Sequence, residues 1–347
     1  MFFASDNGAP VPREVMDAVI RANEGPALPY GDDPLSGRVA DGIRDLFEAP
    51  GAAVYLVATG TAANALSLGL LCPPWGAVYC HEQAHVQEHE CGAPEFFTGG
   101  AKLILVRGTE GRMTPGALEA AIVGRGDVHM VQPGAVSLTN VTEAGSVHSV
   151  AQIAALAAVA RAQGLPVHLD GARLANALAA TGASPAEMTW RAGVDIVSFG
   201  GTKGGLMGAE AVVIFDPARA WEFELRRKRA GHLFSKHRYL AAQFDGWLEG
   251  GLWLRLAEHA NRMAARLAVG IAAQPGGRVL QPVEANIVFA EWPAEAHDRA
   301  EAAGARYYRH GPGGARLVCS WATTEAEVDA FLATLRGAEA RAESASA

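Results

Sequence analysis

Short apolar runs recur between Ala52 and Phe215, and they do not alternate with polar residues. They cover residues 52–58, 76–80, 102–106, 135–139, 166–170, 195–200 and 211–215. Runs of this kind are typical of strands that are covered on both faces. Helical signals lie between most of them, so the pattern predicts an α/β domain with a largely parallel sheet. In such sheets ligands bind beyond the carboxyl ends of the strands.

Three helix starts are marked by a capping side chain followed by proline, whose missing N–H costs nothing at the first helical position. They are Asp33-Pro34, Thr114-Pro115 and Ser184-Pro185. Glu187 lies three residues after Ser184 and completes a capping box. These signals place helices after several of the predicted strands.

The pattern changes after Asp216, where helical stretches follow one another over residues 221–232, 234–248 and 253–274. Two strand candidates, 286–292 and 315–321, and a helix over 324–337 come next. At 347 residues a major and a smaller domain are expected. We predict a major domain over 1–240 with an N-terminal arm, a small C-terminal α+β domain over 241–340, and a frayed tail over 341–347.

Composition and charge favour a small-molecule partner. The formal net charge is -8 and the basic residues are scattered, which excludes the electrostatic footprint of a nucleic-acid or anionic-membrane binder. We expect no signal peptide and no membrane span. The four cysteines are too few for a disulfide framework in so long a chain, which favours a reducing, cytoplasmic location.

Two predicted strands end in residues that carry chemistry. The strand at 166–170 ends in Asp170 and is followed by Arg173, while the strand at 195–200 runs into a glycine-rich turn that holds Lys203. An aspartate at a strand end can keep a pyridinium nitrogen protonated, and a lysine beside it can form a Schiff base with an aldehyde. Taken alone, Asp170 and Arg173 are equally consistent with a helix cap and a solvated arginine. Without Asp170, an exposed turn lysine would be the better interpretation of Lys203.

An earlier strand end completes the set. The segment from Thr59 to Asn64 is rich in small residues and opens a helix, so its backbone N–H groups can bind a phosphate. It is neither a Walker loop nor a dinucleotide fingerprint. A phosphate cup, an aspartate and a lysine, in that chain order at three strand ends, match the needs of pyridoxal 5'-phosphate (PLP), which presents a phosphate, a ring nitrogen and an aldehyde.

The segment that follows the strand at 76–80 contains His81-Glu82-Gln83-Ala84-His85, a formal match to a zinc-protease motif. We reject a metal site, because the two histidines of such a motif lie within one helix and here they follow directly on a strand. His85 can instead stack on the PLP ring and exchange protons. His81 is interpreted as a polar loop residue.

With these residues in place, the chain resembles the low-specificity L-threonine aldolases, a group within the aminotransferase-like, fold type I PLP enzymes. The resemblance covers nearly the whole chain. It is carried by Ser5-Asp6, Tyr30-Gly31-Asp32-Asp33-Pro34, Thr59 to Asn64, Ala84-His85, His168-Leu169-Asp170-Gly171-Ala172-Arg173, Thr202-Lys203 and Ala315-Arg316-Leu317.

The resemblance implies a role for each matched residue. Cofactor contacts are implied for Gly60 and Thr61 on the phosphate, His85 on the ring, Asp170 at the ring nitrogen, and Arg173, Thr202 and Lys203, the aldimine lysine. Arg316, with Ser5 and Arg173, would hold the substrate carboxylate. The family forms its site between subunits, which implies a homodimer or homotetramer in which Tyr30 and a basic residue between Lys228 and Lys236, taken as Lys236, reach across.

The chain departs from better-known members after the strand at 135–139. They carry a second active-site histidine there, whereas this chain reads Thr139-Asn140-Val141-Thr142-Glu143. His89, one helical turn from His85, is a candidate replacement and a candidate substrate contact. The neighbouring Glu88 and Glu90 are equally consistent with a solvated loop.

The resemblance therefore implies a reversible lyase that cleaves L-threonine, L-allo-threonine or related β-hydroxy-α-amino acids, phenylserine among them, to glycine and an aldehyde. Catalysis would rest on Lys203, Asp170, Arg173 and His85, with His85 as the candidate base. Another PLP reaction, such as β-elimination or racemisation, is an open alternative, because cofactor residues do not fix which bond at Cα breaks. The remaining alternatives are a catalytically silent PLP-binding protein and a zinc hydrolase.

Overall fold

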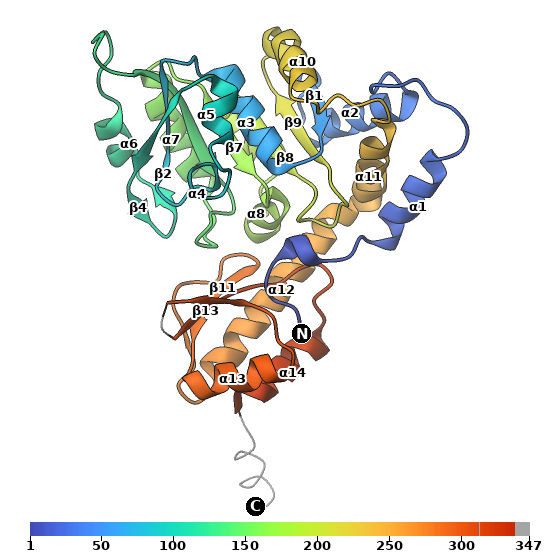
Figure 1. The fold of residues 1–347 in the computed structure, drawn as a ribbon, viewed down its shortest axis with the longest axis vertical. Helices are drawn as coiled ribbons and strands as arrows, with labels where there is room; N and C mark the ends of the chain where they lie inside the picture. Colours follow the sequence, from blue (N-terminus) through green and yellow to red (C-terminus); the bar gives the residue numbers. More distant parts are fainter. Residues whose placement is uncertain (312, 337–347) are drawn as a thin grey trace, which may run out of the picture.

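The computed structural model describes residues 1–311 and 313–336, and its larger part is built on a seven-stranded sheet (Figure 1). In spatial order the strands are β1 (Ala53–Val57), β9 (Glu210–Ile214), β8 (Ile196–Gly200), β7 (Val167–Gly171), β6 (Gln132–Thr139), β2 (Gly76–His81) and β3 (Lys102–Val106). Strand β9 runs antiparallel to both of its neighbours, and the other pairs are parallel. The predicted α/β fold with a largely parallel sheet is confirmed.

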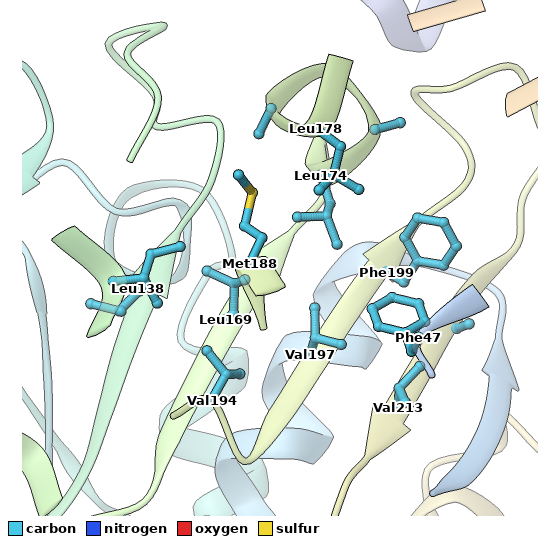
Figure 2. Packing of buried hydrophobic residues seen from close by; sticks show 14 of the residues in the cluster. Phe47, Leu138, Leu169, Leu174, Leu178, Met188, Val194, Val197, Phe199 and Val213 are labelled. Atoms are coloured by element: carbon cyan, nitrogen blue, oxygen red, sulfur yellow. The ribbon is translucent and has the colours of Figure 1, made fainter. Parts of the chain in front are cut away.

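Helices bury both faces of this sheet. On one face lie α7 (Val150–Ala162), α8 (Leu174–Thr181) and α11 (Arg238–Leu248); on the other lie α3 (Gly60–Leu71) and α10 (Ala220–Arg229). Figure 2 shows the first core, in which Leu138, Leu169 and Val197 from three neighbouring strands share one cluster with Leu174 and Leu178 of α8. Ala135, Ile196 and Val212, each next in its strand to a residue of this first core, belong to the core on the opposite face, which explains why apolar runs of the sheet do not alternate with polar residues.

The predicted helix starts are confirmed. The side chains of Asp33, Thr114 and Ser184 accept backbone N–H groups at the starts of α2 (Pro34–Leu46), α6 (Pro115–Ala121) and α9 (Pro185–Met188). The start predicted at residue 234 is wrong, because α11 begins at Arg238. The carbonyl of Ser235 instead accepts the amide of Tyr30 at 3.0 Å, so this segment is tied to the region before α2.

The small C-terminal sheet is antiparallel, and its order is β10 (Arg278–Val279), β11 (Ile287–Glu291), β13 (Gly314–Val318) and β12 (Tyr308–His310). Its core includes side chains of α13 (Ala294–Ala302) and α14 (Glu325–Arg336). The N-terminal segment joins this core: Phe3 is fully buried, and its carbonyl accepts the amide of Val318 at 2.8 Å. Residues 1–6 therefore run from the small sheet toward the larger one.

Helix α12 (Leu252–Ala272) connects the two parts (Figure 1). Trp253 and Ala257, near its start, belong to the core of the large sheet, whereas Met263 and Leu267 belong to the core of the small one. The domain division expected at residue 240 stays a prediction, and the tail expected over 341–347 lies outside the described residues. Within the described part of the chain, no helix combines the length and the apolar character needed to cross a membrane.

Candidate active site

Lys203 lies in a tight turn that follows β8. The amide of Gly201 donates to the buried carboxylate of Glu210 at 2.7 Å, and the indole of Trp247 donates to the carbonyl of Gly204 at 3.0 Å. A Cβ on Gly204 would lie 2.5 Å from the Trp247 ring, so the close packing of this turn requires glycine there. The turn presents Lys203 to a cavity of about 660 Å³ between the two sheets.

Lysine is rare in this chain, which makes that placement informative. The sequence contains four lysines, Lys102, Lys203, Lys228 and Lys236. Among the residues that the structure describes, Lys203 alone of the four lines this cavity. The cavity therefore offers one amine to a carbonyl compound.

Asp170 lies at the end of β7, next to β8 in the sheet. It is 2% exposed; its Oδ1 accepts the amide of Ala172 at 3.0 Å and its Oδ2 accepts the side-chain amide of Asn64 at 3.0 Å. Because β7 and β8 are parallel and paired up to Gly171 and Phe199, Asp170 and the Lys203 turn emerge at the same edge. The structure thus brings together the aspartate and the lysine singled out from the sequence.

The helix start at Gly60 lies at the same place, since Asn64, one turn into α3, is the residue that reaches Asp170. The Thr59 hydroxyl caps α3 by accepting the amide of Ala62 at 3.2 Å. The amides of Gly60 and Thr61 have no acceptor within the helix, and a Cβ on Gly60 would meet nothing within 4 Å. Two donors and open space at a helix N-terminus suit an anion.

His85 is the first residue of the short helix α4 (His85–Glu88) and lines the cavity. Its Nδ1 lies 2.9 Å from Oε1 of Glu90, a carboxyl group that is buried. This hydrogen bond raises the pKa of His85 above its ordinary value against the opposing effect of burial. His89 also lines the cavity, with its ring 5.5 Å from that of His85 and a side chain that is 58% exposed.

Arg173 follows β7 and is engaged by an acid that the sequence reasoning did not assign. Its Nε and Nη2 donate to Asp6 at 2.6 and 2.9 Å, and both side chains are buried. Burial opposes ionisation of Asp6, but the guanidinium holds the pKa of this carboxyl below its ordinary value. Ser5, next in the chain, lines the cavity, so the N-terminal segment contributes to the site as expected.

Arg316 enters the cavity from β13 of the small sheet. Its nearest acidic partner is Glu143, whose Oε2 lies 3.8 Å from Nη2, and both side chains are about one-fifth exposed. Burial would raise the pKa of Glu143, but Arg173, Lys203, His85 and Arg316 together lower it. Glu143 is therefore an ionised carboxylate in the cavity at the position where the sequence departs from the related family.

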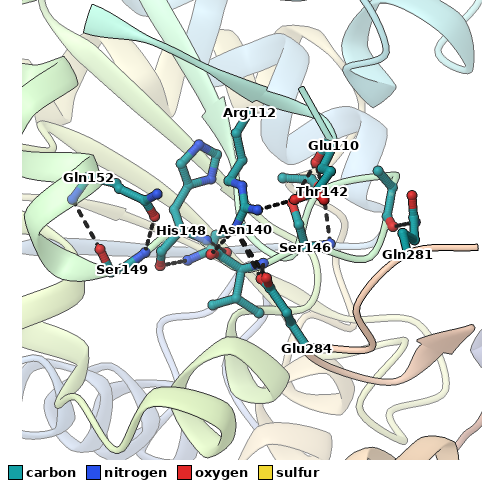
Figure 3. Close-up of polar contacts among 12 residues, drawn as sticks. Glu110, Arg112, Asn140, Thr142, Ser146, His148, Ser149, Gln152, Gln281 and Glu284 are labelled. Carbon is teal, nitrogen blue, oxygen red and sulfur yellow. Dashed lines mark hydrogen bonds and ion pairs between the residues drawn. The ribbon is translucent and has the colours of Figure 1, made fainter. Parts of the chain in front are cut away.

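Figure 3 shows how the loop that carries Glu143 is fixed. The hydroxyls of Thr142 and Ser146 donate to the carbonyl of Glu110 at 3.2 and 2.6 Å, and Glu284 accepts the amide of Val147 at 2.6 Å. Glu110 belongs to the segment joining the short strands β4 (Gly108–Thr109) and β5 (Arg112–Met113), and Glu284 to the segment before β11. The loop is therefore hydrogen-bonded to both the large and the small domain, and these contacts fix the position of Glu143 in the cavity. Its position after β6 is the signal that could have found it.

Tyr30 and Lys236 do not reach this cavity within one chain. Tyr30 lines a second cavity of about 460 Å³ beside β1, where its ring lies 4.7 Å from the Nζ of Lys228. Lys236 is exposed in the adjacent segment. Thr202, also expected at the cofactor, accepts the amide of Ala209 at 3.3 Å and so stabilises the Lys203 turn.

The zinc-like motif is split by the fold. His81 is the last residue of β2 and His85 the first of α4, and the His81 Nδ1 accepts the amide of Gln83 at 3.1 Å. Across residues 1–311 and 313–336, no three His, Cys, Asp or Glu side chains are grouped so that they could hold a metal ion. The two histidines thus do not share a helix face.

Comparison with known sequences agrees with this geometry. The sequence profile of the beta-eliminating lyase family matches residues 3–294. A low specificity L-threonine aldolase from a Pseudomonas sp. is 44% identical over 335 residues, which cover 96% of each chain. One from Pseudomonas aeruginosa is 44% identical over 322 residues, which cover 92% of this chain and 93% of the relative.

Solved structures agree as well. A threonine aldolase from Leishmania major superposes with a TM-score of 0.91 at 30% identity, covering 96% of this chain and 98% of the other. Serine palmitoyltransferase from Sphingomonas wittichii, at 15% identity and a TM-score of 0.70, covers 99% and 88% and shares the fold alone. The family matches and the site geometry together confirm the resemblance read from the sequence: the chain belongs to the low-specificity L-threonine aldolase family, whose members are PLP-dependent lyases of the aminotransferase-like fold.

Proposed function

We propose that this protein cleaves L-threonine, L-allo-threonine and related β-hydroxy-α-amino acids to glycine and an aldehyde, and that the reaction is reversible. The observation that carries the proposal is the meeting of Lys203, Asp170 and the start of α3 at one sheet edge beside a cavity. The names of the Pseudomonas relatives, which match nearly the whole chain, support the same substrate class.

The residues at this edge fit PLP. Lys203 would hold the cofactor through its aldehyde, Asp170 would pair with the ring nitrogen, and the amides of Gly60 and Thr61 would bind the phosphate. Asp170 is buried and positioned by two donated hydrogen bonds, so its carboxylate is oriented before any ligand binds. When bound, PLP supplies an acceptor for the electron pair released at Cα.

Arg316 is the best candidate for binding the substrate carboxylate. Its link to Glu143 is long, so its guanidinium can accept a second anion in fork geometry. Arg173 already donates two hydrogen bonds to Asp6 and is better suited to fixing the floor of the site. Ser5 lines the same wall and can donate its hydroxyl to the carboxylate.

His85 is our candidate for accepting the β-hydroxyl proton of the substrate. It lines the cavity, and its Nδ1 lies 2.9 Å from Oε1 of Glu90, which leaves the other ring nitrogen available to a ligand. Glu143 offers a carboxylate acceptor in the same cavity and can orient that hydroxyl. A role for His89, which is more exposed, stays a prediction.

We further propose a homodimer or homotetramer with shared sites. The separation of Tyr30 and Lys236 from the Lys203 cavity supports it, because these residues can serve an active site only in another subunit. We expect no nucleic-acid or membrane partner. The four unpaired cysteines, three of them buried, support a reducing cytoplasmic location.

The direct test supplies PLP to the purified protein and follows aldehyde and glycine from L-threonine, L-allo-threonine and phenylserine, with alcohol dehydrogenase reporting acetaldehyde. Stoichiometric aldehyde and glycine are expected. Pyruvate from β-substituted amino acids without aldehyde would replace the proposal with β-elimination, and formation of the D-amino acid alone would replace it with racemisation.

A further inference from the structure

Glu90 is a buried carboxyl group with no assigned role in the proposed reaction. The residue is 3% exposed, and its Oε1 lies 2.9 Å from Nδ1 of His85 and 2.8 Å from Nδ2 of Asn64. Its Oε2 is buried without a hydrogen-bond partner among the described residues. A carboxyl group in this state costs folding free energy, so packing alone does not account for it.

The first contact has a chemical consequence for His85. Burial raises the pKa of Glu90, and its hydrogen bonds with His85 and Asn64 act against that rise. When ionised, Glu90 only accepts hydrogen bonds, so the proton of the neutral imidazole then lies on Nδ1 and the lone pair on Nε2. The contact also fixes the ring plane, as carboxylates do for catalytic and metal-binding histidines. His85 is thereby held in the one tautomer that can take a proton from a ligand in the cavity.

The second contact extends the chain of bonds to Asp170. A single amide nitrogen, Nδ2 of Asn64, donates to Glu90 at 2.8 Å and to Asp170 at 3.0 Å. The histidine and the aspartate, which come from α4 and β7, are thus positioned relative to each other through α3. A shift of either carboxylate would displace the other through this shared donor.

We infer that Glu90 is a positioning residue, which sets the tautomer and orientation of His85 and couples them through Asn64 to Asp170. The inference rests on the proposed function in one respect: the proton that His85 accepts is taken to be that of the substrate β-hydroxyl group. The raised pKa of His85 agrees with it, and the other charged or titratable groups that face this ring are Asp170, Lys203, Glu143 and His89.

The test compares Glu90→Gln with a matched control, Glu82→Gln, in the PLP-loaded protein. Glu82 lies in the same segment, but it is 43% exposed and pairs with Arg107 at 3.9 Å outside the cavity. In Glu90→Gln we expect kcat for aldehyde release to fall roughly 10- to 100-fold, the loss typical when a carboxylate that orients a functional histidine is removed. KM should change by less than about threefold, and Glu82→Gln should match the wild type.

The pH profile separates positioning from structural support. Loss of the Glu90 charge removes the interaction that raises the His85 pKa, so the acid limb of kcat/KM should move to lower pH in Glu90→Gln. Glu90→Asp, which keeps the charge, should retain the wild-type limb. An unchanged limb and unchanged kcat in Glu90→Gln would overturn the inference.

A double-mutant cycle covers the case in which folding is also affected. If Glu90 acts through His85, Glu90→Gln should have little further effect on kcat in a His85→Asn background, whereas equal effects in both backgrounds would contradict the inference. If the wild type releases no aldehyde, the proposed function fails. In that case an NMR titration of His85 tests the inference. The pKa of His85 should be lower in Glu90→Gln than in the wild type, and an unchanged pKa would contradict the inference.

Discussion

The two walls of the cavity are built differently. On the side of the large sheet, Asp170, Arg173 and Glu90 are buried at or behind the cavity lining, and each is held by at least two polar contacts. On the wall from the small sheet, Tyr308 is 57% exposed, and Arg316 has one long ionic contact. The proposed reaction centre is therefore preorganised, whereas the side proposed to meet the substrate can adapt.

The largest effect is expected at Lys203. Lys203→Ala removes the one lysine that lines the cavity, so kcat for L-threonine cleavage should fall by at least about 10³-fold. The cofactor absorbance band should be lost on gel filtration, while circular dichroism stays that of the wild type. A variant that keeps both band and turnover would remove Lys203 from the account.

Substitution of Arg173 should lower the free energy of unfolding more than substitution of Arg316 on the opposite side of the cavity. Arg173→Met leaves Asp6 buried without its cation, which should lower the free energy of unfolding by about 3–5 kcal/mol in denaturant titrations. Arg316→Met, its counterpart on the small sheet, should cost less than about 1 kcal/mol because the contact with Glu143 is long. Equal losses would erase the distinction between the two walls.

Substitution of Arg316, on the side of the small sheet, should weaken substrate binding. Arg316→Met should raise KM for L-threonine about 10- to 100-fold, the loss expected for one charged hydrogen-bonding group, with a smaller change in kcat. Arg316→Lys keeps the charge but not the fork and should recover part of the loss. A fall in kcat with unchanged KM would assign Arg316 to the reaction centre instead.

The smallest effect is expected at Tyr308. Because its side chain is largely exposed, Tyr308→Ala should change the free energy of unfolding by about 0.5 kcal/mol or less. It lines the cavity, so the ratio of kcat/KM values for phenylserine and L-threonine should shift by a few-fold. An unchanged ratio would mean that this wall does not contact the substrate side chain.

The apolar pattern of the sequence predicted the strands of the large sheet and, through their ends, the meeting of Asp170 with the Lys203 turn. That prediction succeeded because parallel strands deliver their carboxyl ends to one edge whatever their spacing along the chain. Local residue pattern and tertiary contact agree in this part of the molecule.

Other features depend on contacts that local sequence does not encode. Glu90 lies among polar residues and was equally consistent with a solvated loop, yet it is buried because His85 and Asn64 enclose it. Glu143 was noted only as a departure from the family, and the bonds that fix its loop come from Glu110 and Glu284, both distant in sequence.

Chemical mapping can identify directly the lysine that holds the cofactor, which we propose to be Lys203. The PLP-loaded protein is reduced with borohydride, which makes the link between cofactor and protein permanent, then digested and mapped by mass spectrometry. The chain has four lysines, so the assignment is discrete. We expect a pyridoxyl group on the peptide that contains Lys203, and the same group on Lys102, Lys228 or Lys236 instead would contradict the assignment of Lys203.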